Sequence, residues 1–258
     1  MYQKILSELK KIEKSKNVRI LYACESGSRA WGFPSRDSDY DVRFIYIHPL
    51  EWYLSIQDKR DVIETPISDL LDINGWELRK ALKLLRKSNP PILEWIESPI
   101  VYYESYSTIR KMRDLSRISF SPLSCLYHYL SIAKGNFRKY LHVDRVKIKK
   151  YFYALRPIFA CKWIEEHNTM PPMGFEELVR ASCPDDILAD EINRLLKRKK
   201  SGDELDFGSH IIVLNQFLEE NIQHFDCYLK SVERKEPAEE IIFDEIFIES
   251  LKEVWSQT

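Results

Sequence analysis

The sequence predicts an α+β protein in which a small N-terminal sheet domain, residues 1–110, precedes an all-helical domain, residues 111–258. The first third alternates between helical spacing and short runs rich in β-branched and aromatic residues. From about residue 105 onward the apolar spacing is helical and no strand is predicted. The chain has only 7 glycines, which argues against an all-β fold with many tight turns, and 44% hydrophobic residues, which is typical of a folded core.

Local patterns predict the elements of the first domain. Ile5, Leu9 and Ile12 have helical spacing within residues 2–16. Alternating or β-branched runs predict strands at 18–24, 39–48, 60–66 and 70–74, and helical spacing returns at 76–87. The pair Pro90-Pro91 breaks the chain and is suited to open the next helix, because proline is tolerated in a first helical turn.

Helical spacing continues through the second domain. The predicted helices are 105–115, 122–141, 145–168, 174–181, 186–200, 210–229 and 240–256. No internal repeat and no low-complexity tract interrupts them.

Composition excludes several classes of protein. With 39 Lys+Arg and 40 Asp+Glu the formal net charge is −1, so any nucleic-acid binding must come from a local patch. The five cysteines form no C-x-x-C pair, which favours reduced thiols and offers no zinc site. No apolar run approaches the roughly 20 residues that span a bilayer. We therefore expect a cytoplasmic protein with no membrane partner.

The stretch most informative about function begins after the first predicted strand, with Gly27-Ser28 at the opening of a short helix. Backbone N–H groups exposed there, with the Ser28 hydroxyl and the Arg29 guanidinium, are suited to cradle a phosphate. A lone Gly-Ser pair is far more often only a turn, so this feature predicts little by itself.

Two aspartates follow on the next predicted strand. Asp39 and Asp41 are two residues apart, so their side chains are predicted to project from one face. Two carboxylates on one face repel each other unless a cation compensates, and a hard cation such as Mg²⁺ takes oxygen ligands of this kind. A lone D-x-D is common on surfaces, but its combination with Gly27-Ser28 predicts a metal–triphosphate site.

These residues resemble a known family. A hydrophobic strand, Gly-Ser, ten intervening residues and Asp-Tyr-Asp-Val resemble the signature of the DNA polymerase β-like nucleotidyltransferase superfamily. The fuller stretches at 27–33 and 38–44 are similar to its RlaP-type branch, predicted nucleotidyltransferases proposed to act in RNA repair. Further stretches resembling the same branch lie at 75–80, 89–95, 98–102 and 149–157. The resemblance covers the chain to about residue 175.

The resemblance implies a third carboxylate on a neighbouring strand. Asp72 is our candidate, with Glu64 and Glu77 as alternatives. Asp39, Asp41 and Asp72 would then be the catalytic residues and the ligands of two metal ions, Mg²⁺ or Mn²⁺, with a nucleoside triphosphate (NTP) as substrate. The third carboxylate would help to activate the acceptor hydroxyl.

The cations and aromatic residues near the motif have open roles. Arg43 shares the predicted face of Asp39 and Asp41, so it either touches a phosphate or forms an ion pair with an aspartate. Trp31 and Phe33 are expected to pack beneath the loop rather than stack on a base.

The second domain contains a basic segment, residues 134–150. Its only acid is Asp144, and tyrosines lie within and beside it. Its seven cations are Lys134, Arg138, Lys139, Arg145, Lys147, Lys149 and Lys150. Cations interleaved with aromatics are suited to a nucleotide or a single strand, although a solvated basic helix has the same composition. Lys149, Lys150 and Arg156 are the predicted triphosphate or acceptor contacts.

The sequence thus predicts a nucleotidyltransferase catalytic domain followed by a helical domain that binds nucleotide or acceptor. The predicted reaction moves a nucleoside monophosphate from an NTP to an acceptor hydroxyl, with an RNA end in RNA repair as one such acceptor. The alternative is a catalytically silent partner protein that senses a nucleotide or binds RNA. No motif selects the NTP, the oligomeric state, or RNA over a protein or small-molecule acceptor.

Overall fold

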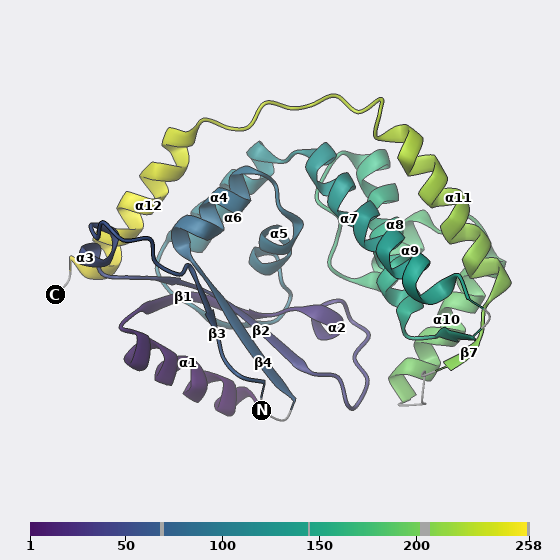
Figure 1. Cartoon of the computed structure of the whole chain (residues 1–258), viewed down its shortest axis with the longest axis horizontal. Coiled ribbons are helices and arrows are strands. Elements are labelled where there is room, and N and C mark those ends of the chain that lie inside the picture. Colours follow the sequence, from purple (N-terminus) through teal and green to yellow (C-terminus); the bar gives the residue numbers. More distant parts are fainter. Residues whose placement is uncertain (68–69, 144, 202–206, 257–258) are drawn as a thin grey trace. The chain divides into compact units, whose positions relative to one another are not determined.

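A computed structural model describes residues 1–67, 70–143, 145–201 and 207–256, and the chain divides into two compact units (Figure 1). The sheet unit comprises Met1–Ala30, Asp39–Ser119 and Pro237–Thr258. The helical unit comprises Trp31–Ser38 and Phe120–Glu236. This division does not follow the predicted boundary between residues 110 and 111. A short segment of the first third belongs to the helical unit, and the last helix belongs to the sheet unit.

The sheet unit is a mixed α/β structure. In chain order its elements are α1 (Tyr2–Lys16), β1 (Arg19–Glu25), α2 (Gly27–Ala30), β2 (Tyr40–Ile47), α3 (Leu50–Tyr53), β3 (Val62–Glu64), β4 (Leu71–Glu77), α4 (Leu78–Arg86), α5 (Pro90–Ile96), β5 (Val101–Glu104), α6 (Thr108–Ser119) and α12 (Glu240–Trp255). The predicted α+β class is confirmed, and the predicted N-terminal helix, the four strands and the helix after Pro90 are all present.

One five-stranded sheet organises this unit, in the order β3-β4-β2-β1-β5. Neighbouring strands are antiparallel except β2 and β4, which are parallel. In that parallel pair Asp41 lies opposite Asp72. Two strands distant in sequence therefore place two aspartates side by side near the starts of β2 and β4.

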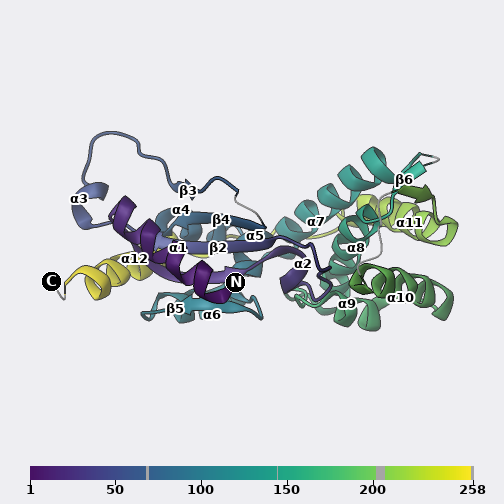
Figure 2. The same ribbon diagram turned by 90° about the horizontal axis from the view of Figure 1, so that it is seen from below.

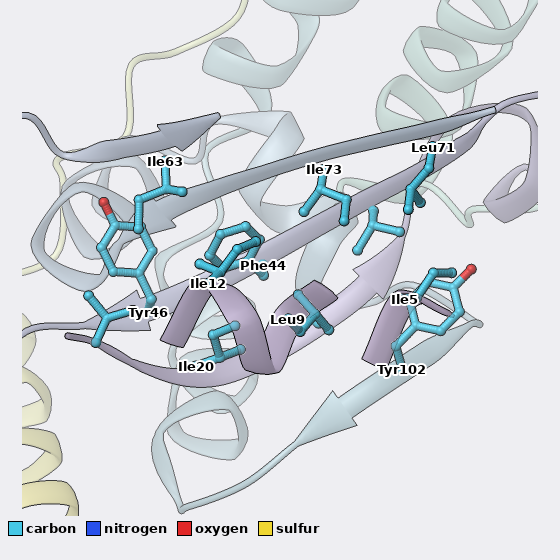
Figure 3. Close-up of a cluster of buried hydrophobic side chains, with 13 residues drawn as sticks. Ile5, Leu9, Ile12, Ile20, Phe44, Tyr46, Ile63, Leu71, Ile73 and Tyr102 are labelled. Carbon is cyan, nitrogen blue, oxygen red and sulfur yellow. The ribbon is translucent and has the colours of Figure 1, made fainter. Parts of the chain in front are cut away.

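Helix α1 covers one face of the sheet (Figure 2). Its apolar side, Ile5, Leu9 and Ile12, is buried as the spacing predicts. These residues pack on the β2 side chains Val42 and Phe44 in the cluster drawn in Figure 3. Each fully buried aliphatic side chain contributes about 1.5–3 kcal/mol to folding, so this layer fixes which residues of β2 face α1. Because side chains alternate along a strand, the odd-numbered β2 residues Asp41 and Arg43 project from the opposite face.

Helices α4, α5 and α6 lie on the opposite side of the sheet from α1 (Figure 1). In α4 the residues Leu78, Ala81, Leu82 and Leu85 are buried, the apolar stripe of an amphipathic helix. Glu77 caps this helix, since its carboxylate accepts a hydrogen bond from the Arg79 backbone N–H at 2.8 Å.

The helical unit contains α7 (Pro122–Asn136), a π-helical turn η1 (Phe137–Leu141), β6 (Arg145–Lys147), α8 (Lys150–His167), α9 (Phe175–Ser182), α10 (Asp186–Ser201), β7 (Phe207–Ser209) and α11 (Ile212–Tyr228). Phe33 of the segment Trp31–Ser38 is completely buried here, with its ring 5.1 Å from that of Phe152 and 5.5 Å from that of Phe175. The Phe175 N–H donates to the Trp31 carbonyl at 2.9 Å. As predicted, both rings pack against the protein: Phe33 is completely buried, and Trp31 is half-buried against Phe33 and Tyr153.

Three short strands, and the packing of the last helix on the sheet unit, were not predicted. Strands β6 and β7, three residues each, pair with one another; β6 lies at the start of the helix predicted at 145–168, and β7 lies between the helices predicted at 186–200 and 210–229. Strand β5 exposes three of its four residues. Strands this short have no readable alternation. Helix α12 joins the sheet unit through hydrogen bonds from Ser107 to Glu253 and between Thr108 and Ser250, contacts that no local pattern contains.

Within the described residues, no helix is both long and apolar enough to cross a bilayer. All five cysteines are free thiols, and Cys24, Cys125 and Cys161 are buried.

Candidate functional site

The predicted phosphate-binding turn lies directly against Asp41. Gly27 begins α2 with a φ of 58°, a left-handed conformation that glycine adopts easily. A Cβ at this position would lie 2.1 Å from Asp41 Oδ2, so any side chain would overlap the carboxylate. Ser28 follows and is buried. Glycine is therefore required at this position for two reasons: the left-handed backbone conformation and the lack of space beside the Asp41 carboxylate.

The backbone of Asp41 is held on both sides. Its N–H donates to Glu25 Oε1 at 2.7 Å, and its carbonyl accepts from the Ser26 N–H at 2.9 Å. Glu25 is completely buried, and its second oxygen accepts from the Tyr102 hydroxyl. Burial raises the pKa of the Glu25 carboxyl, while the hydrogen bonds from Tyr102 and from the Asp41 N–H oppose that rise. Sequence reasoning did not select Glu25, although an acid ending an apolar strand directly before the motif is a usable signal.

Arg43 joins the two aspartates that the strand register brings together. Its Nη2 lies 3.1 Å from Asp41 Oδ1 and 2.8 Å from Asp72 Oδ2, and its Nη1 donates to the Asp72 carbonyl at 3.2 Å. Of the two roles open to Arg43 in the sequence, this structure contains the ion pair. A phosphate contact by Arg43 stays a prediction.

The surroundings of Asp41 favour a cation beside it. Burial raises the pKa of its carboxyl, Arg43 lowers it, and the charges of Asp72 and Asp39 raise it again. The Asp41 and Asp72 side chains are only 28% and 31% exposed. Two partly desolvated carboxylates of like charge are stable together only with positive charge between them, which the Arg43 guanidinium supplies here.

Asp72 is the third-carboxylate candidate that adjoins Asp41. Glu64 is exposed on β3, where it pairs with Arg60. Glu77 lies at the other end of β4, roughly 16 Å along the strand from Asp72 at 3.3 Å per residue. There it caps α4 and accepts from the Tyr53 hydroxyl at 2.6 Å.

Asp39 lies outside the strand on which it was predicted. Strand β2 begins at Tyr40, so Asp39 is an exposed residue just before the strand rather than part of it. Its carbonyl accepts from Arg29 Nε at 3.0 Å, and the Arg29 guanidinium lies 3.7 Å from the centroid of the Tyr40 ring. Within the ranges that the structure describes, no group of three or more Asp, Glu, His or Cys side chains could hold a metal ion. The metal-ligand role of Asp39 stays a prediction.

The remaining predicted contacts belong to the helical unit. Lys149 precedes α8, and Lys150 Nζ lies 4.6 Å from the Tyr140 ring centroid. Arg156 is buried, with its guanidinium 4.4 Å from the Trp31 ring. Their contacts to nucleotide or acceptor stay predictions. Asp144, the one acid of the basic segment, lies outside the described residues.

A turn that admits only glycine thus lies against a carboxylate near the start of β2, the middle strand of the sheet. The family described as the RNA repair pathway DNA polymerase beta family, RlaP, matches residues 1–249, and the chain belongs to it.

The known proteins that are similar to the chain include the following two. An uncharacterized protein of Bacillus subtilis strain 168, YcgL, is 51% identical over 257 residues, which are 99% of this chain and 98% of the relative. A crystal structure of a nucleotidyltransferase-like protein from Exiguobacterium sibiricum 255-15 covers 96% of this chain and 80% of its own, with 10% identity and a TM-score of 0.29. That structural similarity is too weak to define the fold.

Proposed function

We propose that the protein is a metal-dependent nucleotidyltransferase that moves a nucleoside monophosphate from an NTP to an acceptor hydroxyl. The observation that carries this proposal is the placement of the Gly27 turn against Asp41, with Asp72 facing Asp41 across the parallel strands. Membership of an RNA repair family favours an RNA end as the acceptor.

The donors present fit a hard divalent cation. Asp41 and Asp72 offer carboxylate oxygens and their side chains are partly accessible, and a divalent cation would replace the Arg43 guanidinium that lies between them here. Mg²⁺ or Mn²⁺ would be held by these two residues and, by resemblance to the superfamily, by Asp39. When bound, the metal would offset charge on the triphosphate and lower the pKa of the acceptor hydroxyl.

The residues of the chain have distinct tasks in this proposal. Backbone N–H groups of the Gly27-Ser28 turn and the Arg29 guanidinium receive the phosphates. The acceptor oxygen attacks the α-phosphorus, its proton passes to the carboxylate of Asp72, and the bond from the α-phosphorus to the bridging oxygen breaks as pyrophosphate leaves. Glu25 and Ser26 hold the Asp41 backbone in place throughout, because both of its polar groups are bonded to them.

One observation favours the alternative, a catalytically silent protein that senses a nucleotide or binds RNA. Arg43 pairs with both carboxylates. In a silent protein that ion pair would be permanent and no divalent cation would replace it. The two functions therefore differ in whether Mg²⁺ or Mn²⁺ binds at Asp41 and Asp72.

The test incubates pure protein with each α-labelled NTP, Mg²⁺ or Mn²⁺ and an RNA pool. Wild type is compared with Asp41→Asn, Asp72→Asn and the matched control Glu64→Gln, which neutralises an exposed carboxylate on a neighbouring strand. The proposal expects labelled RNA and pyrophosphate from wild type and Glu64→Gln, and neither from the two Asn variants. Metal-dependent NTP binding without transfer would point to another acceptor. Metal-independent NTP binding that survives Asp41→Asn would favour the silent protein.

A further inference from the structure

A second charged region lies in the helical unit, where strand pairing gathers residues from distant parts of the chain. Strand β6 pairs antiparallel with β7, which sets Lys147 opposite Phe207 and Arg145 opposite Ser209. The turn η1 brings Lys139 and Tyr140 to the same region, since Lys147 lies near the Tyr140 ring. We call the set Lys139, Tyr140, Arg145, Lys147, Lys150 and Phe207 the basic–aromatic surface.

Cations surround both rings of this surface. The Nζ atoms of Lys150, Lys139 and Lys147 lie 4.6, 5.2 and 5.9 Å from the Tyr140 centroid. The Phe207 ring has Lys147 Nζ at 5.5 Å and the Arg145 guanidinium at 5.6 Å. Lys147 therefore lies near both rings.

These cations are not neutralised within the described part of the chain. Across residues 1–67, 70–143, 145–201 and 207–256, none of the four forms a salt bridge with a carboxylate. Their effect is felt by Tyr140, whose pKa is lowered, first by a hydrogen bond with Lys139 and then by the charges of the lysines. Asp144 and residues 202–206, which adjoin the surface in sequence, lie outside the described residues.

The rings are open to a ligand. Phe207 is 52% exposed, although burial of a phenylalanine is favourable, and Tyr140 is half-buried. A solvated basic helix would keep its aromatics in the core and direct only its cations outward. Here an apolar ring instead lies exposed among positive charges.

We propose that the basic–aromatic surface binds single-stranded nucleic acid, with bases stacked on Phe207 and Tyr140 and phosphates paired with the four cations. Single strands alone offer both an accessible base face and a regularly spaced negative charge. A duplex hides its base faces, and a free nucleotide would engage only one of the two rings. Binding at this surface requires neither Asp41 nor Asp72. The proposal can therefore be tested independently of the proposed transfer reaction.

The test measures fluorescence anisotropy of a labelled single-stranded oligoribonucleotide with the full chain. Stacking on an aromatic residue contributes about 1–3 kcal/mol per base, so Phe207→Ala is expected to weaken binding about 5- to 150-fold. Lys147→Gln is expected to weaken binding and to make the slope of log K against log salt less negative by about 0.7. Because Phe207 is exposed, its loss leaves the core intact, which circular dichroism checks.

Two matched controls belong to the same unit. Ile187→Ala removes an apolar side chain that is 74% exposed on α10, and Lys230→Gln removes an exposed cation after α11. Both are expected to bind RNA as wild type does, and so is the double variant Asp41→Asn/Asp72→Asn. Absence of binding would overturn the proposal. So would a duplex bound as tightly as the single strand, or losses in Phe207→Ala and Lys147→Gln no larger than those of the controls.

Discussion

Replacement of Gly27 by alanine tests the arrangement on which the site depends. The new Cβ would lie 2.1 Å from Asp41 Oδ2, more than an ångström short of ordinary van der Waals contact. The Asp41 backbone cannot yield easily, because Glu25 and Ser26 bond its N–H and its carbonyl. The Asp41 side chain must therefore rotate away, and it loses its contact with Arg43.

Two costs combine in this variant. A non-glycine residue in the left-handed conformation costs about 1–2 kcal/mol. Driving the aspartate from its rotamer adds about 0.5–1.5 kcal/mol. We therefore expect Gly27→Ala to lower the free energy of unfolding by about 1.5–3.5 kcal/mol, measured by urea denaturation. A displacement of about 1 Å in a reacting group can cost 100-fold in rate, so transfer activity should fall by at least that factor.

Gly32→Ala is the matched control. Gly32 also has positive φ, 86°, yet a Cβ there would meet no atom within 4 Å. In this variant the free energy of unfolding is expected to fall only by the cost of the left-handed backbone conformation, about 1–2 kcal/mol, and activity is expected to be retained. Equal losses of stability in the two variants, with activity kept in both, would refute the idea that the Gly27 turn and the Asp41 carboxylate share one space.

Three further predictions concern charge, pH and packing. Arg43→Gln leaves the Asp41 and Asp72 carboxylates facing each other without a positive charge between them. Without metal the free energy of unfolding should therefore fall by about 1–2 kcal/mol, a value reduced from that of a fully buried ion pair because the side chains are partly exposed. Added Mg²⁺ should then stabilise the variant more than wild type in the same denaturation assay, and an equal effect on both would contradict this. Burial and the charge of Lys59 lower the pKa of His48 to about 4. The unfolded chain therefore takes up a proton first as pH falls below about 6.5, and wild type should lose about 1–2 kcal/mol more than His48→Phe between pH 7 and pH 5. Parallel pH profiles of the two proteins in urea would exclude that assignment. Phe33→Ala removes a completely buried ring and should cost about 3–5 kcal/mol by urea denaturation. A loss below about 1 kcal/mol would mean that the ring is not part of the core.

Local patterns predicted most helices and the central strands because apolar spacing is strong there. The helix at Tyr2–Lys16 buries the side that its spacing reveals, and the strand at Tyr40–Ile47, an apolar run, is buried over its second half. The short strands β6 and β7 were not predicted, because three residues are too few to show an alternating pattern. Their pairing also joins residues far apart in the sequence, such as Arg145 and Ser209.

The candidate site shows the same division between local and long-range information. Gly27 and Asp41 could be selected from sequence, because the motif between them is continuous. The sequence offered Asp72, Glu64 and Glu77 as the third acid, and only the parallel register of β2 with β4 sets Asp72 beside Asp41. The role of Glu25 was hidden for a different reason. A buried carboxylate is rare, and its partner Tyr102 is reached only through the fold.

The segment Trp31–Ser38 has a consequence for how this protein can be divided or recombined. It belongs to the helical unit, yet Ala30 before it and Asp39 after it belong to the sheet unit. The chain therefore passes from one unit to the other between residues 30 and 31, 38 and 39, 119 and 120, and 236 and 237. A fragment ending near residue 119 would contain Phe33 but not the aromatic residues that pack on it, and it would lack α12. Neither unit is thus a transferable module, and gene fusion or domain shuffling would have to carry both together.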